Sequence, residues 1–171
     1  MPIPRPGSRA PDFEMLDHEG KPVRLSQFLG KTVVLYFYPK DDTPGCTREA
    51  CSFRDDTARY RKEGAVILGV SPDPPQSHSR FREKFHLTFP LLADEDHKVS
   101  RAYGVWGKKK FIGREYMGLK RTTFIVDPQG KVRRVFEGVR TEGHSQEVLN
   151  SLQDKGTEEP PAPRAKSRKS A

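Results

Sequence analysis

The sequence has very few cysteines, since only Cys46 and Cys51 carry thiols among its 171 residues. Two cysteines cannot build the several disulfides that hold small secreted domains together. Long apolar runs are missing as well. Residues 1–17 are proline-rich with scattered charges and hold no apolar signal segment. No stretch approaches the roughly 18 apolar residues of a membrane span. We therefore expect a protein of the reducing cytoplasm without a membrane partner.

Sequence signals for a bound cofactor or metal are also missing. No glycine-rich pattern of the G-x-G-x-x-G or phosphate-loop kind occurs, so no nucleotide cofactor is predicted. The histidines show no spacing of the H-x-x-x-H kind, and two cysteines five residues apart are a poor zinc set without nearby partners. We therefore predict no metal site. The histidines are His18, His78, His86, His97 and His144.

Positive charge exceeds negative charge, with 31 Lys and Arg against 23 Asp and Glu and a formal net charge of +8. Nucleic-acid binding is one interpretation of this excess, through residues 108–110, Arg133, Arg134 and the C-terminal end of the chain. A solvated basic surface is the simpler interpretation, and we favour it.

The composition changes at Lys155, where apolar periodicity ends and Gly, Pro, Glu and basic residues take over. Residues 155–171 are accordingly predicted to form a disordered basic tail. Residues 1–154 are enough for one folded domain with a full core. A non-enzymatic interaction protein that acts through the tail is an alternative function. Deletion of the tail would separate the two, because an enzymatic activity should survive it.

Strand-like and helix-like segments alternate along the folded part, which favours an α/β fold with a sheet flanked by helices. Residues 104–117 read as either a β-hairpin or a loop. The predicted strands are 13–16, 23–25, 32–38, 65–70, 89–93, 121–126 and 131–136. The predicted helices are a short turn at 27–29 capped by Ser26, and 46–62, 76–86, 97–103 and 144–152.

The segment from Pro39 to Cys51 contains both thiols and is the most informative part of the sequence. The run Thr32–Tyr38 before it is β-branched and aromatic without charge, which is typical of a strand buried on both faces. Pro39 ends this strand, a turn follows, and Cys46 then lies in the first turn of a helix. There the free N–H groups and the helix dipole favour an anion such as a thiolate. Cys46 is therefore predicted to be reactive, although its placement alone leaves a small buried packing residue possible.

The spacing of the two thiols restricts how they can bond. Five residues along a helix turn the chain by about 140° net and place the two Cα atoms roughly 8 to 9 Å apart. A disulfide needs the Cα atoms within about 7 Å of each other. Cys46 and Cys51 can therefore bond only if the first helical turns unwind, which suggests a catalytic or switching pair rather than a structural disulfide.

The pattern Pro39-x-x-x-Thr43-x-x-Cys46, set between a strand and a helix, resembles the active-site motif of the peroxiredoxins. The longer run from Pro44 to Cys51, Pro-Gly-Cys-Thr-x-Glu-x-Cys, is similar to that of the peroxiredoxin Q subfamily, also called bacterioferritin comigratory protein. The resemblance covers about residues 5–153. Further matching segments are 7–13, 69–71, 81–85, 89–94, 102–106 and 121–127.

The resemblance implies a thioredoxin-like fold, with a central mixed sheet flanked by helices, and thiol peroxidase activity. Cys46 would be the nucleophile that attacks the peroxide, and Thr43 would hydrogen-bond the peroxide through its hydroxyl. Pro39 would shield the thiolate from water, Arg121 would be the cation beside it, and Cys51 would be the resolving thiol of the same chain.

The resemblance also implies the partners of the reaction. The substrates would be hydrogen peroxide and organic hydroperoxides, and the reductant of the disulfide would be thioredoxin or a glutaredoxin-like protein. A chain that carries both thiols needs no partner subunit for resolution, so we expect a monomer.

Each assignment has a simpler alternative when the residues are considered alone. Cys51 could be an inert helix thiol, Arg121 a surface cation on a strand, and Thr43 only a helix cap, which is compatible with peroxide binding. Glu49 is assigned no catalytic role. A thiol–disulfide redox sensor on the same fold is a further alternative, although such proteins usually carry a C-x-x-C motif after the strand, which this chain lacks.

Overall fold

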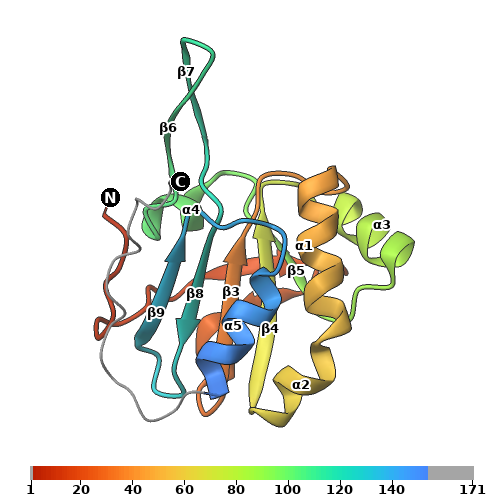
Figure 1. Cartoon of the computed structure of the whole chain (residues 1–171), viewed down its shortest axis with the longest axis vertical. Coiled ribbons are helices and arrows are strands. Elements are labelled where there is room, and N and C mark those ends of the chain that lie inside the picture. Colours follow the sequence, from red (N-terminus) through yellow and green to blue (C-terminus); the bar gives the residue numbers. More distant parts are fainter. Residues whose placement is uncertain (1, 154–171) are drawn as a thin grey trace, which may run out of the picture.

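The computed structural model describes residues 2–153 of the chain. The predicted tail, residues 155–171, lies outside these residues. The described part contains both strands and helices in the order that the sequence predicts, and the predicted α/β class is confirmed. In Figure 1 a central sheet carries helices against its face, with a two-stranded hairpin extending beyond it.

A seven-stranded mixed sheet forms the centre of the molecule, in the order β2-β1-β5-β4-β3-β8-β9. Its inner strands β3, β4 and β5 are parallel, and the outer pairs run antiparallel to their neighbours. Every residue of β3 is buried, as the uncharged apolar run predicts. The strands are β1 Glu14–Asp17, β2 Pro22–Arg24, β3 Thr32–Phe37, β4 Ala65–Ser71, β5 Leu91–Ala93, β8 Thr122–Val126 and β9 Val132–Glu137.

The two faces of the sheet bury two separate apolar clusters. Alternate residues of β3 point to opposite faces, so Val34 and Tyr36 belong to one cluster while Val33, Leu35 and Phe37 belong to the other. The first cluster packs under α1, α2, α3 and α5, and the second under α4, the N-terminal segment and η1. The helices are η1 Leu25–Phe28, α1 Pro44–Asp55, α2 Thr57–Lys62, α3 Pro75–Phe85, α4 Lys98–Ala102 and α5 His144–Gln153.

The helix predicted over residues 46–62 is wrong as a single element, because α1 and α2 are separated at Asp56. The Asp56 backbone turns tightly, with φ −100° and ψ 8°. Its carboxylate also accepts a hydrogen bond of 2.8 Å from Ser145 Oγ at the start of α5. The break is therefore fixed by a contact 89 residues away in sequence, which local periodicity does not reveal.

The short helix near residue 27 also differs from the prediction. It is a 3-10 helix that begins at Leu25, and Ser26 lies inside it rather than capping it. The side chain of Gln27 closes its start by accepting a hydrogen bond from the backbone N–H of Arg24. A glutamine that reaches back to the cap position thus takes the role that we predict for the serine.

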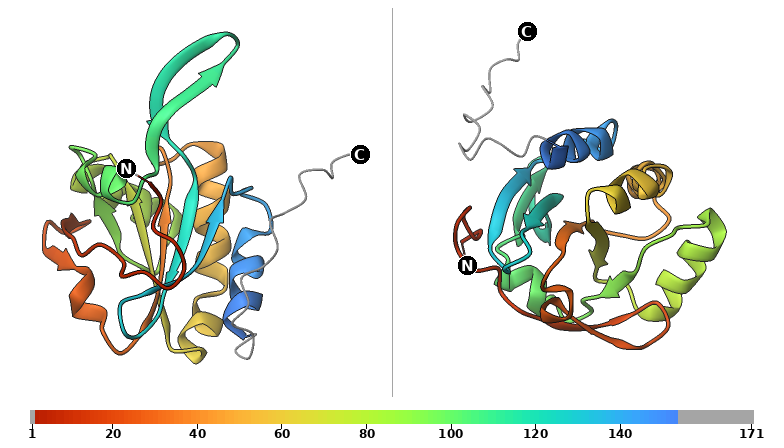
Figure 2. Two further views of the ribbon diagram at one scale, coloured as in Figure 1. Left: turned by 90° about the vertical axis from the view of Figure 1, so that its left-hand side faces the viewer. Right: turned by 90° about the horizontal axis from the view of Figure 1, so that it is seen from below.

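Residues 104–117, predicted as a hairpin or a loop, belong to a hairpin of β6 Trp106–Phe111 and β7 Arg114–Leu119, which ends two residues later than predicted. These two strands form a sheet of their own and pair with no strand of the central sheet. Figures 1 and 2 show the hairpin projecting well beyond the body of the molecule. Among residues 2–153 no helix is long and apolar enough to cross a membrane.

Candidate active site

The turn after β3 places Cys46 at the end of the sheet. The strand ends at Phe37, and Pro39 and the turn residues lead directly into α1, whose third residue is Cys46. The side chain of Cys46 points into the apolar cluster under α1, and only 1% of the residue is exposed. The thiol is therefore shielded from bulk water while its backbone lies in the first turn of a helix, where an anion is stabilised.

Arg121 approaches this thiol from a neighbouring strand. It lies directly before β8, whose first residue Thr122 pairs with Phe37 at the end of β3. Arg121 Nη2 donates a hydrogen bond to Cys46 Sγ over 3.2 Å. Its side chain is 22% exposed, so the cation acts from a largely desolvated position where its field is weakly screened.

Glu49 holds the other side of the same guanidinium. Arg121 Nη1 donates to Glu49 Oε1 over 3.1 Å, and the side chain of Glu49 is only 1% exposed. Burial raises the pKa of Glu49 from 4.5 to about 7, although the nearby Arg121 charge and its hydrogen bond lower it in part. The two terminal nitrogens of the planar Arg121 guanidinium thus bridge a buried carboxyl and a buried thiol.

Glu49→Gln is expected to change the pH dependence of stability. Between about pH 4.5 and pH 7 the folded protein holds a proton on Glu49 that the unfolded chain has lost, so this group destabilises the fold as the pH rises. The stability that Glu49 contributes is fully present below pH 4.5 and is lost through pH 7. The free energy of unfolding of the wild type relative to the variant should therefore fall by on the order of 3 kcal/mol across this window.

Urea unfolding at a series of pH values measures this difference. Glu95→Gln, which removes an exposed carboxylate from the turn after β5, is the matched control. A difference between the wild type and Glu49→Gln that stays constant with pH would show that Glu49 does not titrate in this range.

Gly45 allows the close approach of Arg121 to the helix. A Cβ atom at this position would lie 3.0 Å from Arg121 Nη2 and 3.5 Å from Thr141 Cγ2. A side chain here would push the guanidinium away from Cys46. The glycine before the thiol therefore makes room for the cation, in addition to weakening the first helical turn.

Thr43 and Pro39 lie on the turn that leads into α1. Thr43 occupies the cap position of α1 in extended conformation, but its side chain makes no capping bond. Its hydroxyl donates instead to the carbonyl oxygen of Lys40 over 3.0 Å, which leaves the oxygen lone pairs available as acceptors. Pro39 is half-buried between the end of β3 and this turn.

Cys51 lies on α1 five residues beyond Cys46, and both thiols are free. Cys51 is half-buried, whereas Cys46 is fully buried. The helix is continuous from Pro44 to Asp55, so the two thiols share one intact helix. A bond between them requires α1 to unwind locally, as the sequence predicts from the helical spacing.

A buried network on α3 anchors the turn that precedes Cys46. Asp41 accepts hydrogen bonds from the Tyr38 hydroxyl at 2.6 Å and from Ser77 Oγ at 2.7 Å. His78 Nδ1 lies 2.7 Å from the same carboxylate, and its other ring nitrogen lies 3.0 Å from the carbonyl oxygen of Leu92. The turn before α1 is therefore held by side chains of α3 rather than by α1 itself.

Sequence reasoning missed both Glu49 and His78. Glu49 lies three residues after Cys46, on the same side of the helix, and this spacing is the signal that could have indicated it. The signal for His78 is its helical spacing, because it lies three residues before Phe81 and seven before Phe85 and so shares their face of the predicted helix.

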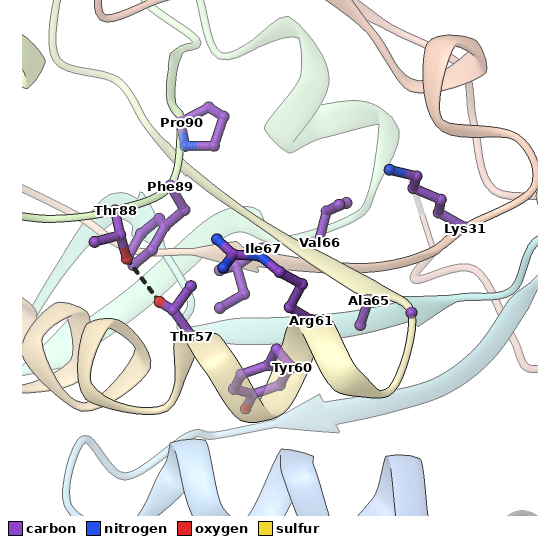
Figure 3. Close-up of a pocket in the computed structure, with 11 residues that line it drawn as sticks. Lys31, Thr57, Tyr60, Arg61, Ala65, Val66, Ile67, Thr88, Phe89 and Pro90 are labelled. Atoms are coloured by element: carbon purple, nitrogen blue, oxygen red, sulfur yellow. Dashed lines mark hydrogen bonds between the residues drawn. The ribbon is translucent and has the colours of Figure 1, made fainter.

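A pocket of about 310 Å³ lies at the other end of the sheet, where β3 and β4 begin. Figure 3 shows Arg61 and Lys31 at this pocket, with the hydroxyls of Thr57 and Thr88 hydrogen-bonded to each other at 2.6 Å. None of the predicted site residues lines it. The pocket is thus separate from the thiol site.

The described residues offer one set of side chains that could together hold a metal ion. Asp17, His18 and Glu19, on the turn between β1 and β2, have ligand atoms within 4.8 Å of one another. The carboxylates are partly or fully exposed, and such acidic groups commonly gather at a turn without an ion. We assign no metal to them.

The chain is similar to known proteins over most of its length. Residues 6–135 match the AhpC/TSA family. Peroxiredoxin Bcp of Bacillus subtilis (strain 168) is 47% identical over 148 residues, which is 86% of this chain and 94% of that protein. Peroxiredoxin Bcp of Escherichia coli (strain K12) is 46% identical over the same length, with 86% and 95% covered.

A solved structure shows the same fold. The bacterioferritin comigratory protein of Xanthomonas campestris, studied for its alkyl peroxide reduction activity, superposes with a TM-score of 0.79 at 37% identity. The superposition covers 82% of this chain and 90% of that one. The predicted thioredoxin-like fold and the predicted resemblance are both confirmed.

Proposed function

The chain belongs to the AhpC/TSA family of peroxiredoxins, and we propose that Cys46 is the thiol with which it reduces hydroperoxides. Membership makes the protein a thiol peroxidase, an antioxidant oxidoreductase with a thioredoxin fold. The observation that carries the assignment to Cys46 is the 3.2 Å contact between its sulfur and Arg121 Nη2. A cation and a helix N-terminus then act together on one buried sulfur.

In the first step the Cys46 thiolate attacks the nearer oxygen of a hydroperoxide. The O–O bond breaks, sulfur becomes a sulfenic acid, and the distal oxygen leaves as water or an alcohol once it is protonated. Arg121 and the N–H groups at the start of α1 stabilise the negative charge that develops on the oxygens. Thr43 holds the peroxide through its hydroxyl, and Pro39 keeps water from the sulfur.

In the second step the Cys51 thiol attacks the sulfenic sulfur of Cys46. The S–S bond forms, the sulfenic oxygen leaves as water, and the start of α1 must unwind for the two sulfurs to meet. Three features support a low cost for this step. The cap residue Thr43 makes no side-chain capping bond, Gly45 lies in the first turn, and the turn before it is fixed independently to α3.

In the third step a dithiol protein reduces the Cys46–Cys51 disulfide by exchange and becomes oxidised itself. We propose thioredoxin or a glutaredoxin-like protein as this reductant, and a monomer as the working form, because both thiols belong to one chain. The related protein of Xanthomonas campestris is described with alkyl peroxide reduction activity, and we propose that organic hydroperoxides are substrates here beside hydrogen peroxide.

Cys51→Ser is expected to stop turnover without stopping the first reaction with peroxide. One equivalent of hydrogen peroxide should convert Cys46 of the variant to a sulfenic acid that dimedone traps, whereas the wild type should form an intramolecular disulfide. With thioredoxin and its reductase, the wild type should consume peroxide continuously and the variant should not.

Mass spectrometry of the trapped adduct and peroxide consumption measure these two outcomes. The wild type with the same reductant pair is the control. Turnover of Cys51→Ser at the wild-type rate would show that Cys51 is not the resolving thiol.

A further inference from the structure

The hairpin β6–β7 carries most of the large hydrophobic side chains that are exposed in the described chain. Six large hydrophobic residues are exposed among residues 2–153, and four of them lie on this hairpin. The two elsewhere are Leu16 and Leu29. The four are Phe111 at 65% exposure, Ile112 at 84%, Tyr116 at 47% and Met117 at 51%.

The apex of the hairpin is also unfavourable for its own backbone. Ile112 and Gly113 form the two-residue turn, with φ angles of 49° and 74°. A turn with two positive φ angles favours Asn-Gly or Asp-Gly, and a β-branched residue at positive φ is strained. Ile112 therefore carries two costs at once, a strained backbone and an apolar side chain in water, and contact with a partner would relieve the second.

Beyond its base, where Trp106 stacks on His97 and Leu119 is buried, both faces of the hairpin are largely exposed. Strand pairing places Tyr116 and Phe111 on one face and Met117 on the other, so each face carries exposed apolar area. A two-stranded sheet on its own is only marginally stable in water. Its exposed apolar surface, its strained apex and its isolation from the central sheet are together typical of an interaction surface.

The charge on the hairpin restricts the kind of partner. Residues 106–120 contain five basic side chains and one acidic side chain. Lys109 folds back to donate to the carbonyl oxygen of Leu119 over 3.0 Å, whereas Lys108, Lys110 and Arg114 are exposed. Such a surface attracts an acidic partner and repels a second copy of this chain, whose net charge is +8.

The position of the hairpin links it to the thiol site. A single residue, Lys120, separates the end of β7 from Arg121, which contacts Cys46. Figure 1 shows that the hairpin rises from the end of the central sheet at which α1 begins, and Cys46 lies in the first turn of α1. A protein that reaches the Cys46–Cys51 disulfide must approach this end, and the six-residue strands extend about 20 Å, far enough to contact it.

We propose that the β6–β7 hairpin is the docking arm for the dithiol protein that reduces this enzyme. The apex, Phe111 and Ile112, would enter an apolar surface of the reductant, and the surrounding lysines would face its acidic groups. This inference rests on the proposed function, since it requires a protein reductant of the Cys46–Cys51 disulfide.

Ile112→Asn separates docking from folding, because Asn-Gly is the favoured sequence for this turn and should maintain or improve hairpin stability. The oxidised protein is reduced under single-turnover conditions, once by thioredoxin and once by dithiothreitol. The variant should react with thioredoxin about tenfold more slowly, the loss expected when one buried isoleucine no longer contributes to docking. Its reactions with dithiothreitol and with hydrogen peroxide should match the wild type.

Two control variants accompany this test. Leu29→Asn removes an exposed apolar side chain far from the thiol and should react with thioredoxin at the wild-type rate. Lys110→Glu reverses one exposed charge of the hairpin and should slow the thioredoxin reaction most at low salt, whereas Lys62→Glu at the end of α2 should not.

Several results would overturn the proposal. Equal rates of wild type and Ile112→Asn with thioredoxin would show that the hairpin does not dock the reductant. With those rates equal, binding of the wild type but not the variant to phosphatidylglycerol vesicles would assign the hairpin to a membrane surface. A dimer in sedimentation that Ile112→Asn dissociates would assign it to a second copy. A wild type that forms no disulfide with peroxide would instead reject the proposed function, and this outcome is visible before any reductant is added.

Discussion

Cys46→Ser is expected to abolish peroxide reduction by this protein. The serine hydroxyl occupies nearly the same space but is not ionised at neutral pH and forms no counterpart of a sulfenic acid. The remaining Cys51 is half-buried in the middle of α1, away from the helix N-terminus, and the Arg121 guanidinium donates to Cys46 and Glu49 instead. It should therefore not replace Cys46 as the nucleophile.

The fold should survive this substitution. Cys46 lies against the apolar cluster under α1, but Arg121 can donate to a hydroxyl oxygen as it does to the sulfur. Circular dichroism and urea unfolding establish that the variant is folded, and peroxide consumption with thioredoxin and its reductase measures activity. Loss of the first reaction with peroxide in Cys51→Ser but not in Cys46→Ser would reverse the two assignments.

The central strand shows which parts of the fold the sequence determines locally. β3 is a six-residue run without charge, and a strand buried on both faces is the structure that such a run favours. The break at Asp56 is different, because it depends on the hydrogen bond from Ser145 on a distant helix. The hairpin β6–β7 could not be told from a loop, because both of its faces are exposed and no alternation of apolar and polar residues marks it.

The thiol site also contains residues that the local sequence indicates and residues that only distant contacts bring in. The location of Cys46 at a helix start follows from the strand, the proline and the turn residues around it. Arg121 is 75 residues away, and only the resemblance to a family motif connects it to the thiol. Glu49 looks like an ordinary helix charge in the sequence, and only tertiary packing, which buries it beside Arg121, makes it part of the site.

These contacts bear on the proposed second step, in which the first turn of α1 unwinds. Asp41 fixes the turn before α1 through contacts with Tyr38, Ser77 and His78. Tyr38 directly follows β3, and the other two residues lie on α3, so none of the three belongs to α1. Arg121 reaches Cys46 by a side-chain contact alone. Under the proposed mechanism, unwinding of the first turn of α1 would therefore leave the contacts of Asp41 in place.

Arg121→Met is expected to slow the reaction of the reduced protein with hydrogen peroxide by about 10²–10³-fold, the usual cost of removing one donor that stabilises transition-state charge. The substitution removes the hydrogen bond that Arg121 Nη2 donates to Cys46 Sγ. Arg121→Lys should be intermediate, because an ammonium is a point charge that cannot bridge Cys46 and Glu49 as the guanidinium fork does. Stopped-flow measurement of the peroxide reaction gives these rates.

Loss of Arg121 also leaves Glu49 buried without its cation, which would destabilise the fold. A slower peroxide reaction could then come from this destabilisation rather than from the missing contact with Cys46. The Arg121 variants are therefore also prepared with Glu49→Gln, so that no unpaired carboxylate remains. Arg48→Met is the matched control, because Arg48 is an exposed cation on the same helix that bonds Thr141 rather than the thiol. If Arg121→Met in the Glu49→Gln background reacts as fast as Arg48→Met, the contact with Cys46 positions the sulfur at most and does not lower the barrier. If only the Arg121 variants react more slowly with peroxide, this guanidinium stabilises the O–O bond as it breaks.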